Sequence, residues 1–310
     1  GRRAAGRGGT GASFGFKRLK AFTVKASKEA AAGMRYAEEF SLAAAIKEQR
    51  SEMGLRRKSG DPFYAFGTSR GPIYAAKNGR MPTANYTSTD AQIPDLAALK
   101  VGGGEGGQTA HAVAKGAKPV AVVASMSTHE LSGEHWHESL PDAKQSGCCA
   151  PCPIACEAAD RPTIDGQKVR GRPVHMNRVD RPEYETLAML GSNLGIGSSL
   201  DVMDGNDACN RLGVDTISAG AALSFMCEVA QRGWLPATWS DHFHAPFAFG
   251  AYAEGDVVPW TFGIPELPPL ALHLLAHATP GDGTLFGTLS AGAVGASEFI
   301  EELTGHPTTQ

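Results

Sequence analysis

The chain has 310 residues, 42% of them hydrophobic, and carries a formal net charge of −3. This length and apolar content are enough for one large domain or two, and the slightly negative charge argues against nucleic-acid binding by bulk electrostatics. No apolar run approaches the roughly 20 residues that a membrane-spanning helix needs. We therefore expect a cytoplasmic protein without nucleic-acid or membrane partners.

Glycine dominates the start of the chain, in the run Gly6-Arg7-Gly8-Gly9-Thr10-Gly11. Such a loop can present backbone N–H groups and a guanidinium to a phosphate. The spacing fits neither a P-loop nor a dinucleotide-binding turn, and a flexible basic terminus explains the run equally well. The pattern of residues 19–25, which follow, predicts a β-strand.

The next hundred residues divide into three parts. Residues 27–53 have a helical pattern, with Ser27 as a candidate N-cap and Gly54 as a candidate stop. Residues 55–90 are expected to form loops and short extended pieces. Residues 91–128 contain a glycine-rich run and lack clear periodicity, so we expect an insertion or a mobile linker.

Three cysteines, Cys149, Cys152 and Cys156, follow with C-x2-C-x3-C spacing. Thiolates this close on a looped backbone can converge on one metal centre, and their softness selects an iron–sulfur cluster, zinc or copper(I). Buried or disulfide-bonded cysteines are the alternative, but six cysteines are sparse for a disulfide scaffold. The spacing favours a metal site whose fourth ligand comes from elsewhere, either a [4Fe-4S] cluster or a Cys3His zinc site.

The remainder of the chain is predicted to be mainly helical. One helix is expected to begin at Pro182. Further helices are expected over residues 204–212, which Gly213 would end, over residues 216–232, which Gly233 would end, and over residues 266–278 and 288–303. Helices and strands do not alternate, so a doubly wound parallel sheet is not expected. The predicted fold class is mainly α, a helical domain that follows a short β remnant at the N-terminus.

Other cysteines and histidines have simpler interpretations. Cys209 and Cys227 lie in helical segments, where we expect small buried apolar side chains. Two pairs look like metal ligands: His135 with His137, and His242 with His244. Neither pair has an evident third ligand in the surrounding sequence, so zinc is not expected at either.

Six stretches in order give the chain a family likeness: it resembles the tungsten-dependent aldehyde:ferredoxin oxidoreductases. The stretches are residues 6–12 running into 17–21, residues 67–68, 82–86, the cysteine motif 149–156, residues 182–186 and residues 206–218. The likeness covers residues 6–232 and fades beyond them into a general helical pattern.

The resemblance implies an activity and a set of cofactors. Family members hold a tungsten (or molybdenum) bis-pterin beside a [4Fe-4S] cluster, oxidise aldehydes to carboxylic acids and pass electrons to ferredoxin. The roles that carry over are as follows: cluster ligands Cys149, Cys152 and Cys156; a pterin-phosphate loop at Arg7, Gly8 and Gly9; a general acid/base at Glu185; and a pterin-binding turn at Asn210, Gly213, Val214 and Asp215. Some members have aspartate where this chain has Asn210, and an amide also makes hydrogen bonds to a pterin.

Without the resemblance, two of these residues have plainer explanations. Glu185 at a helix start favours the positive end of the helix dipole, and Asp215 caps the next helix. The resemblance also implies two units: residues 1–26 as the end of an N-terminal β-rich pterin-binding domain, and residues 27–310 as a helical domain with the cluster-binding loop.

The family's C-terminal segment, which holds the fourth cluster cysteine, a second pterin-binding turn and a histidine near the metal, is not found. We therefore expect a fragment or a decayed copy, assembled as a homodimer or with a second chain that supplies the missing segments. The alternative from another functional class is a non-catalytic Cys3His zinc-binding structural module. A radical S-adenosylmethionine enzyme is a weaker rival, because its C-x3-C-x2-C motif reverses the spacing.

Overall fold

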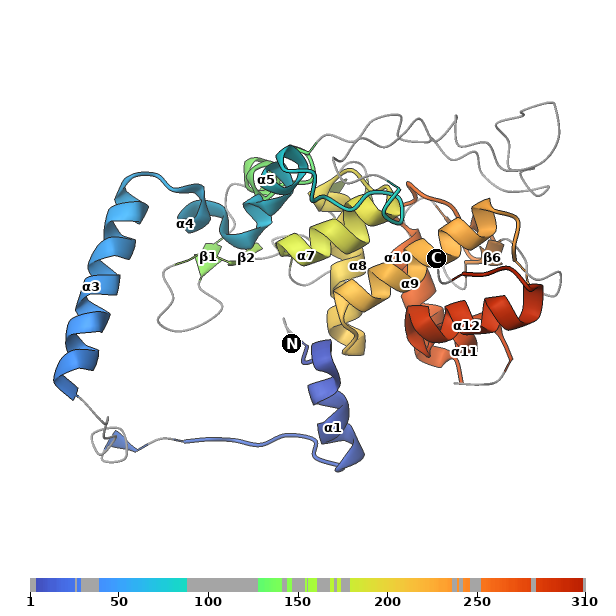
Figure 1. Ribbon diagram of the computed structural model, residues 1–310, viewed down its shortest axis with the longest axis horizontal. Helices are drawn as coiled ribbons and strands as arrows, with labels where there is room; N and C mark the ends of the chain where they lie inside the picture. The colour runs from blue at the N-terminus through green and yellow to red at the C-terminus, as the bar shows by residue number, and fades with distance from the viewer. Residues whose placement is uncertain are drawn as a thin grey trace.

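The computed structural model describes residues 4–25, 27–28, 39–87, 128–140, 144–146, 154, 156–160, 168–169, 172–173, 179–235, 239, 242–245, 252–279 and 283–308, and most of them are helical (Figure 1). The α-helices are α1 (Thr10–Phe16), α3 (Glu39–Lys58), α4 (Pro62–Phe66), α5 (Gly71–Lys77), α6 (Gly133–Ser139), α7 (Tyr184–Thr186), α8 (Ser199–Leu212), α9 (Thr216–Gln231), α10 (Leu267–His277), α11 (Leu285–Leu289) and α12 (Gly292–Thr304). Shorter segments are the 3-10 turns η1 (Arg7–Gly9), η2 (Gly67–Arg70) and η4 (Ser192–Leu194) and the π-helical η3 (Leu187–Gly191).

Strands in the described part of the chain are short, antiparallel and arranged in small sheets. One sheet has the order β1 (Lys144–Ser146), β2 (Glu157–Asp160), β5 (Val179–Asp180), and two hairpins pair β3 (Lys168–Val169) with β4 (Arg172–Pro173) and β6 (His242–His244) with β7 (Val257–Pro259). In register, Gln145 faces Ala158 and Phe243 faces Val258. The predicted mainly α class is confirmed.

The strand predicted over residues 19–25 is wrong. These residues have no regular secondary structure, are exposed, and follow two helical segments, η1 and α1, rather than a sheet. A strand needs a hydrogen-bonded neighbour to be stable in water, and no described segment pairs with residues 19–25. The β remnant expected at the N-terminus is therefore absent from the described residues.

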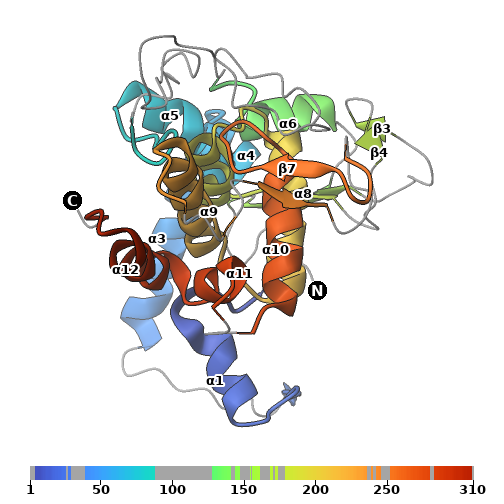
Figure 2. The same cartoon turned by 90° about the vertical axis from the view of Figure 1, so that its right-hand side faces the viewer.

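A helical segment formed by α7, η3 and η4 is the centre of the core. Residues 186–196 are all buried, and both α8 and α9 pack against this segment. Helix α10 packs on α8, and α12 packs on α9, as Figure 2 shows. Leu190, Leu223 and Leu270 are fully buried between these helices.

The two cysteines expected in the core lie there, which confirms that interpretation. Cys209 and Cys227 are both fully buried. Burial raises the pKa of Cys209 to about 12, and burial also raises the pKa of Cys227. Both thiols are therefore protonated at neutral pH and behave as small apolar groups.

Local capping chemistry sets the helix ends that the sequence predicts. Gly213 has φ +76° and ends α8, where the Val214 N–H donates to the Cys209 carbonyl oxygen at 2.9 Å. Asp215 then caps α9 by accepting a hydrogen bond from the Ser218 N–H at 3.0 Å. Gly233 follows α9 with φ +69°. Helix α8 begins five residues before the predicted start, because Ser198 caps it through the Leu200 N–H.

Helix α3 differs from the prediction at its C-terminal end. It continues through Gly54 to Lys58 and ends at Gly60, which has φ +78°. A helical glycine costs only about 1 kcal/mol, and the good helix formers Leu55 and Arg56 follow it. At the other end, the candidate N-cap Ser27 is followed by the helical Lys28, and residues 29–38 lie outside the described residues. Residues 62–77 form the short helices α4, η2 and α5 rather than the expected loops, whereas residues 78–87 form turns with short bridges. Figure 1 shows α3 projecting away from the core.

Three consecutive left-handed residues form an anchored turn. Ala84, Asn85 and Tyr86 have φ between +45° and +64°. The Ala84 and Asn85 N–H groups donate to the carbonyl oxygens of Ser192 and Asn193, both at 3.0 Å. These hydrogen bonds hold the three residues in a left-handed conformation that non-glycine residues rarely adopt.

Side chains tie the same turn to α9. The Asn85 amide donates to Glu228 and accepts from the Ser224 hydroxyl, which in turn accepts from the Asn193 amide. This fixed polar network joins the turn, η4 and α9 within the core.

The predicted insertion over residues 91–128 lies outside the described residues except for residue 128. Among the described helices, none is by itself long and apolar enough to cross a membrane. The pair α8 and α9, bent by 118°, meets the length and composition criteria when the two are combined.

Close helix packing gives a stability test at Gly220. A Cβ atom there would lie 2.4 Å from the Met189 carbonyl oxygen, so α9 touches η3 directly through this glycine. We expect Gly220→Ala to lower the free energy of unfolding by about 1–3 kcal/mol, measured by chemical denaturation. Gly54→Ala is the control, because a Cβ there meets no atom within 4 Å. An equal response of both variants would contradict this packing.

Candidate functional site

A polar cavity of about 220 Å³ lies where the N-terminal loop meets the central helices. Four parts of the chain form its walls: the loop before α1, the end of β5 with α7, the second half of α8, and the start of α9. The lining residues are Ala4, Gly6, Arg7, Asp180, Arg181, Glu183, Thr186, Asn206, Asn210, Val214, Asp215 and Thr216.

Gly6 brings the N-terminal loop directly against the α8–α9 turn. A Cβ atom at this position would lie 2.6 Å from the Asp215 nitrogen and 3.0 Å from the Gly213 carbonyl oxygen. Only glycine allows two backbones to approach this closely. Two stretches that the sequence assigned to the same cofactor, Arg7–Gly9 and residues 210–215, are therefore neighbours.

An ion pair closes this contact. Arg7 Nε lies 2.9 Å from Asp215 Oδ1, and Asp215 Oδ2 accepts from the N–H and hydroxyl of Ser218, each at 3.0 Å. The Arg7 side chain is 57% exposed and that of Asp215 is 11% exposed. Arg7 also lines the cavity, and a guanidinium has further N–H donors with which it can bind an anion.

The pKa of Asp215 reflects three opposed effects. Partial burial raises it, the Ser218 hydrogen bonds lower it, and Arg7 lowers it further, so that the net pKa lies below its ordinary value of 3.8. Asp215 is therefore a carboxylate at neutral pH, and it serves as both helix cap and ion-pair partner.

Gly8 and Gly9 have left-handed φ values of +71° and +69°. The Gly9 N–H donates to the Gly6 carbonyl oxygen at 3.2 Å, which closes the η1 turn. Neither Gly8 nor Gly9 lines the cavity, although the preceding residues Gly6 and Arg7 do. The conformation explains the glycines, since other residues adopt it only with strain.

Amides, hydroxyls and the charged residues Asp180, Arg181 and Glu183 supply the rest of the polar lining. Asn206 and Asn210 lie one turn apart on α8, with Asn210 Nδ2 3.5 Å from Asn206 Oδ1. Across the cavity the hydroxyls of Thr186 and Thr216 are 3.0 Å apart. The lining thus holds two guanidiniums, two amides, two hydroxyls and the three carboxylates of Asp180, Glu183 and Asp215. The guanidiniums can bind a phosphate, and the amides, hydroxyls and carboxylates can hydrogen-bond the N–H groups and ring atoms of a polar heterocycle. The described residues therefore fit a pterin cofactor by their chemistry.

Glu185 lies on α7 and is half-buried, outside the residues that line the cavity. Glu183, two residues earlier, lines the cavity instead. Glu185 does influence its neighbour: burial raises the pKa of Tyr184, and the charge of Glu185 raises it further. Glu183 and Glu185 thus flank Tyr184 in the chain, and of the two only Glu183 lines the cavity.

Arg181 connects the cavity with the cysteine motif. It is 2% exposed, lines the cavity, and its guanidinium carbon lies 5.8 Å from the centre of the Trp136 ring. Burial lowers the pKa of Arg181 to about 10, against the raising effects of nearby Cys156 and Glu134. Arg181 is therefore cationic at neutral pH, and it is close enough to Cys156, one of the three predicted cluster ligands, for their charges to interact.

The predicted convergence of the three cysteines lies mostly outside the described residues. Cys156 is half-buried just before β2, whereas Cys149 and Cys152 are outside the described part of the chain. The cluster therefore stays a prediction.

Several lining residues were not predicted from the sequence. Asn206 could have been recognised, because its i, i+4 spacing from Asn210 puts both amides on one helix face. Glu183 and Thr186 belong to the stretch 182–186 but were given no role, and Arg181 lies just before that stretch. Their roles depend on tertiary contacts with α9 and α6.

The lowered pKa of Asp215 predicts a pH-dependent contribution to stability. A depressed carboxyl pKa stabilises the fold fully above the unfolded value near 3.8, and this contribution is lost as the pH falls through the folded value. Asp215→Asn keeps a good cap but removes the charge, so its free energy of unfolding should fall below wild type above pH 4. The two proteins should converge in more acidic buffer. A difference that persists unchanged at low pH would refute this assignment.

Comparison with known proteins identifies the family. Residues 44–254 match the family described as aldehyde ferredoxin oxidoreductase, domains 2 and 3. The tungsten-containing aldehyde ferredoxin oxidoreductases of Pyrococcus furiosus and Thermococcus kodakarensis are each 27% identical over 236 residues, 76% of this chain and 30% of theirs. That of Pyrococcus horikoshii is 25% identical over 235 residues. The chain thus spans about 30% of the length of these relatives. Because the family match covers more than half of the chain, the chain belongs to the aldehyde ferredoxin oxidoreductase family.

Proposed function

We propose that this chain is part of an oxidoreductase that converts aldehydes to carboxylic acids, with a tungsten (or molybdenum) bis-pterin and a [4Fe-4S] cluster, and delivers electrons to ferredoxin. Each aldehyde and one water give a carboxylic acid, two protons and two electrons. The observation that carries the proposal is the polar cavity in which Arg7 and Asp215 meet, since two motifs whose members are 208 residues apart line it together.

The pterin metal centre, when bound, would supply the two-electron redox chemistry. Residues of this chain would hold it. Arg7 would bind a phosphate group, and Asn206, Asn210 and Asp215 would hydrogen-bond a heterocycle; Gly8, Gly9, Gly213 and Val214 would shape the backbone around it. Glu185 would accept or donate the proton at the reacting group.

Arg181 supports the link between the cavity and the cluster. In our proposal Cys149, Cys152 and Cys156 ligate the cluster, with a fourth ligand from another segment or chain. A buried cation beside Cys156 would stabilise the added negative charge of a reduced cluster.

Metal content tests the proposal. Anaerobically expressed chain should be brown, with roughly four irons per chain and broad visible absorption. Cys156→Ser should lower the iron content and bleach this absorption, because it removes one cluster thiolate. The matched control is Cys209→Ala, which removes a buried thiol that we place in no site. Colourless protein whose single zinc is lost in Cys156→Ser would instead support the Cys3His structural module and overturn the proposal.

Two matched variants test the acid/base assignment. In protein that contains tungsten or molybdenum, Glu185→Gln should slow aldehyde oxidation by about 100-fold or more while the metal content is unchanged, because only proton transfer is removed. Glu183→Gln should retain more activity. The assignment fails if Glu183→Gln is the more damaging change, which would move the role to the carboxylate that lines the cavity.

A further inference from the structure

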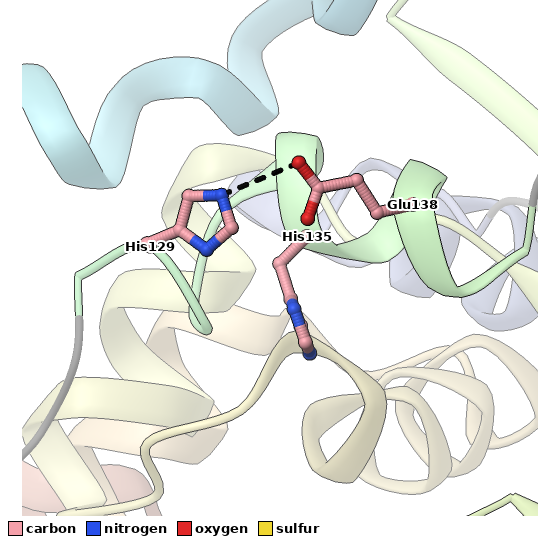
Figure 3. Close-up of side chains that lie close together, drawn as sticks. All are labelled: His129, His135 and Glu138. Atoms are coloured by element: carbon pink, nitrogen blue, oxygen red, sulfur yellow. Dashed lines mark ion pairs between the residues drawn. The ribbon is translucent and has the colours of Figure 1, made fainter.

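A cluster of two histidines and one glutamate lies on α6 and the turn before it (Figure 3). Each of His129, His135 and Glu138 offers one ligand atom, and these atoms all lie within 4.8 Å of one another. His129 Nε2 is 3.5 Å from Glu138 Oε1, and the two imidazole rings are 5.8 Å apart between centroids. None of the three belongs to the cavity described above.

The backbone brings these side chains together. His135 and Glu138 are three residues apart on α6 and so share a helix face. His129 reaches the same place because the Ser132 N–H and hydroxyl donate to its carbonyl oxygen, at 2.9 and 2.5 Å. The Ser132 hydroxyl in turn accepts from the His135 N–H at 3.3 Å, as the N-cap of the helix.

Contacts with the core hold α6 and the turn before it in place. The Ser199 N–H at the start of α8 donates to the Glu130 carbonyl oxygen at 2.9 Å. Leu131 and Trp136 are fully buried, and Trp136 Nε1 donates to Met203 Sδ at 3.1 Å. The site therefore combines a fixed backbone with accessible side chains, since those of His129 and Glu138 are 51% and 62% exposed.

We propose that His129, His135 and Glu138 bind a divalent transition-metal ion, with Zn²⁺ as the ion that they fit best. Two imidazoles and one carboxylate are a known zinc ligand set that leaves a position for water. Mg²⁺ and Ca²⁺ prefer all-oxygen sites, so they suit it less well. In tetrahedral zinc the ligand atoms lie roughly 3.4 Å apart, so the exposed side chains need to close by roughly 1 Å.

This site differs from the His135 and His137 pair, which looks like a metal pair in the sequence but at which zinc was not expected. His137 lies two residues beyond His135 on the helix, and its ring is 6.0 Å from that of Phe66. The third ligand was missed because His129 precedes the helix by several residues. On β6 the His242 and His244 rings are 6.4 Å apart, and no third ligand joins them among the described residues.

Zinc titration of the full-length chain tests the site once the cysteine motif is removed. In a Cys149→Ser/Cys152→Ser/Cys156→Ser background, calorimetry should show one Zn²⁺ bound per chain. His129→Gln and Glu138→Gln should each weaken binding by more than about 100-fold, since even outer-shell changes cost 10- to 100-fold. His137→Gln is the matched control on the same helix and should bind zinc as the background does.

Absence of zinc binding in a folded background, or equal binding by His129→Gln, would overturn the proposal. Circular dichroism checks the fold of every variant. If the serine background does not fold, Co²⁺ titration of the wild-type chain replaces it. Thiolate-bound Co²⁺ adds near-ultraviolet charge-transfer absorption, so nitrogen- and oxygen-bound Co²⁺ is resolved separately. Loss of the absorption of nitrogen- and oxygen-bound Co²⁺ in His129→Gln but not in His137→Gln supports the site. Retention of this absorption in both variants refutes the site.

Discussion

Burial of residues 186–196, from the end of α7 through η3 and η4, is the constraint on which the rest of this structure depends. Its middle lies under α8 and α9, where Gly220 removes the side chain that would keep α9 away from Met189. Its C-terminal end, at Ser192 and Asn193, fixes the left-handed turn at residues 84–86. Its N-terminal end supplies one wall of the polar cavity. One buried helix thereby orients both the fold and the site.

The cavity is assembled from weak individual contacts on a rigid frame. A partly exposed ion pair such as Arg7 with Asp215 contributes less than about 1 kcal/mol. What positions it is the close approach of Gly6 to the α8–α9 turn, together with the cap that holds Asp215. The electrostatic contact can therefore serve ligand binding while backbone packing maintains its geometry.

The sequence predicted features that depend on local chemistry. Gly213 and Asp215 end and start helices through capping, which needs only neighbouring residues, and both lie where expected. The strand over residues 19–25 failed because strands need distant partners. Motif positions likewise predicted that Arg7 and Asp215 share a site, whereas Thr186 and Arg181 enter it through tertiary contacts that no local pattern encodes.

The pairing of Arg7 with Asp215 joins residues that are 208 positions apart. During synthesis the N-terminal loop leaves the ribosome long before α8 and α9 exist. The cavity therefore cannot form until residues up to the start of α9 have emerged and folded. Any cofactor that needs both walls can therefore be inserted only after α8 and the start of α9 have been made.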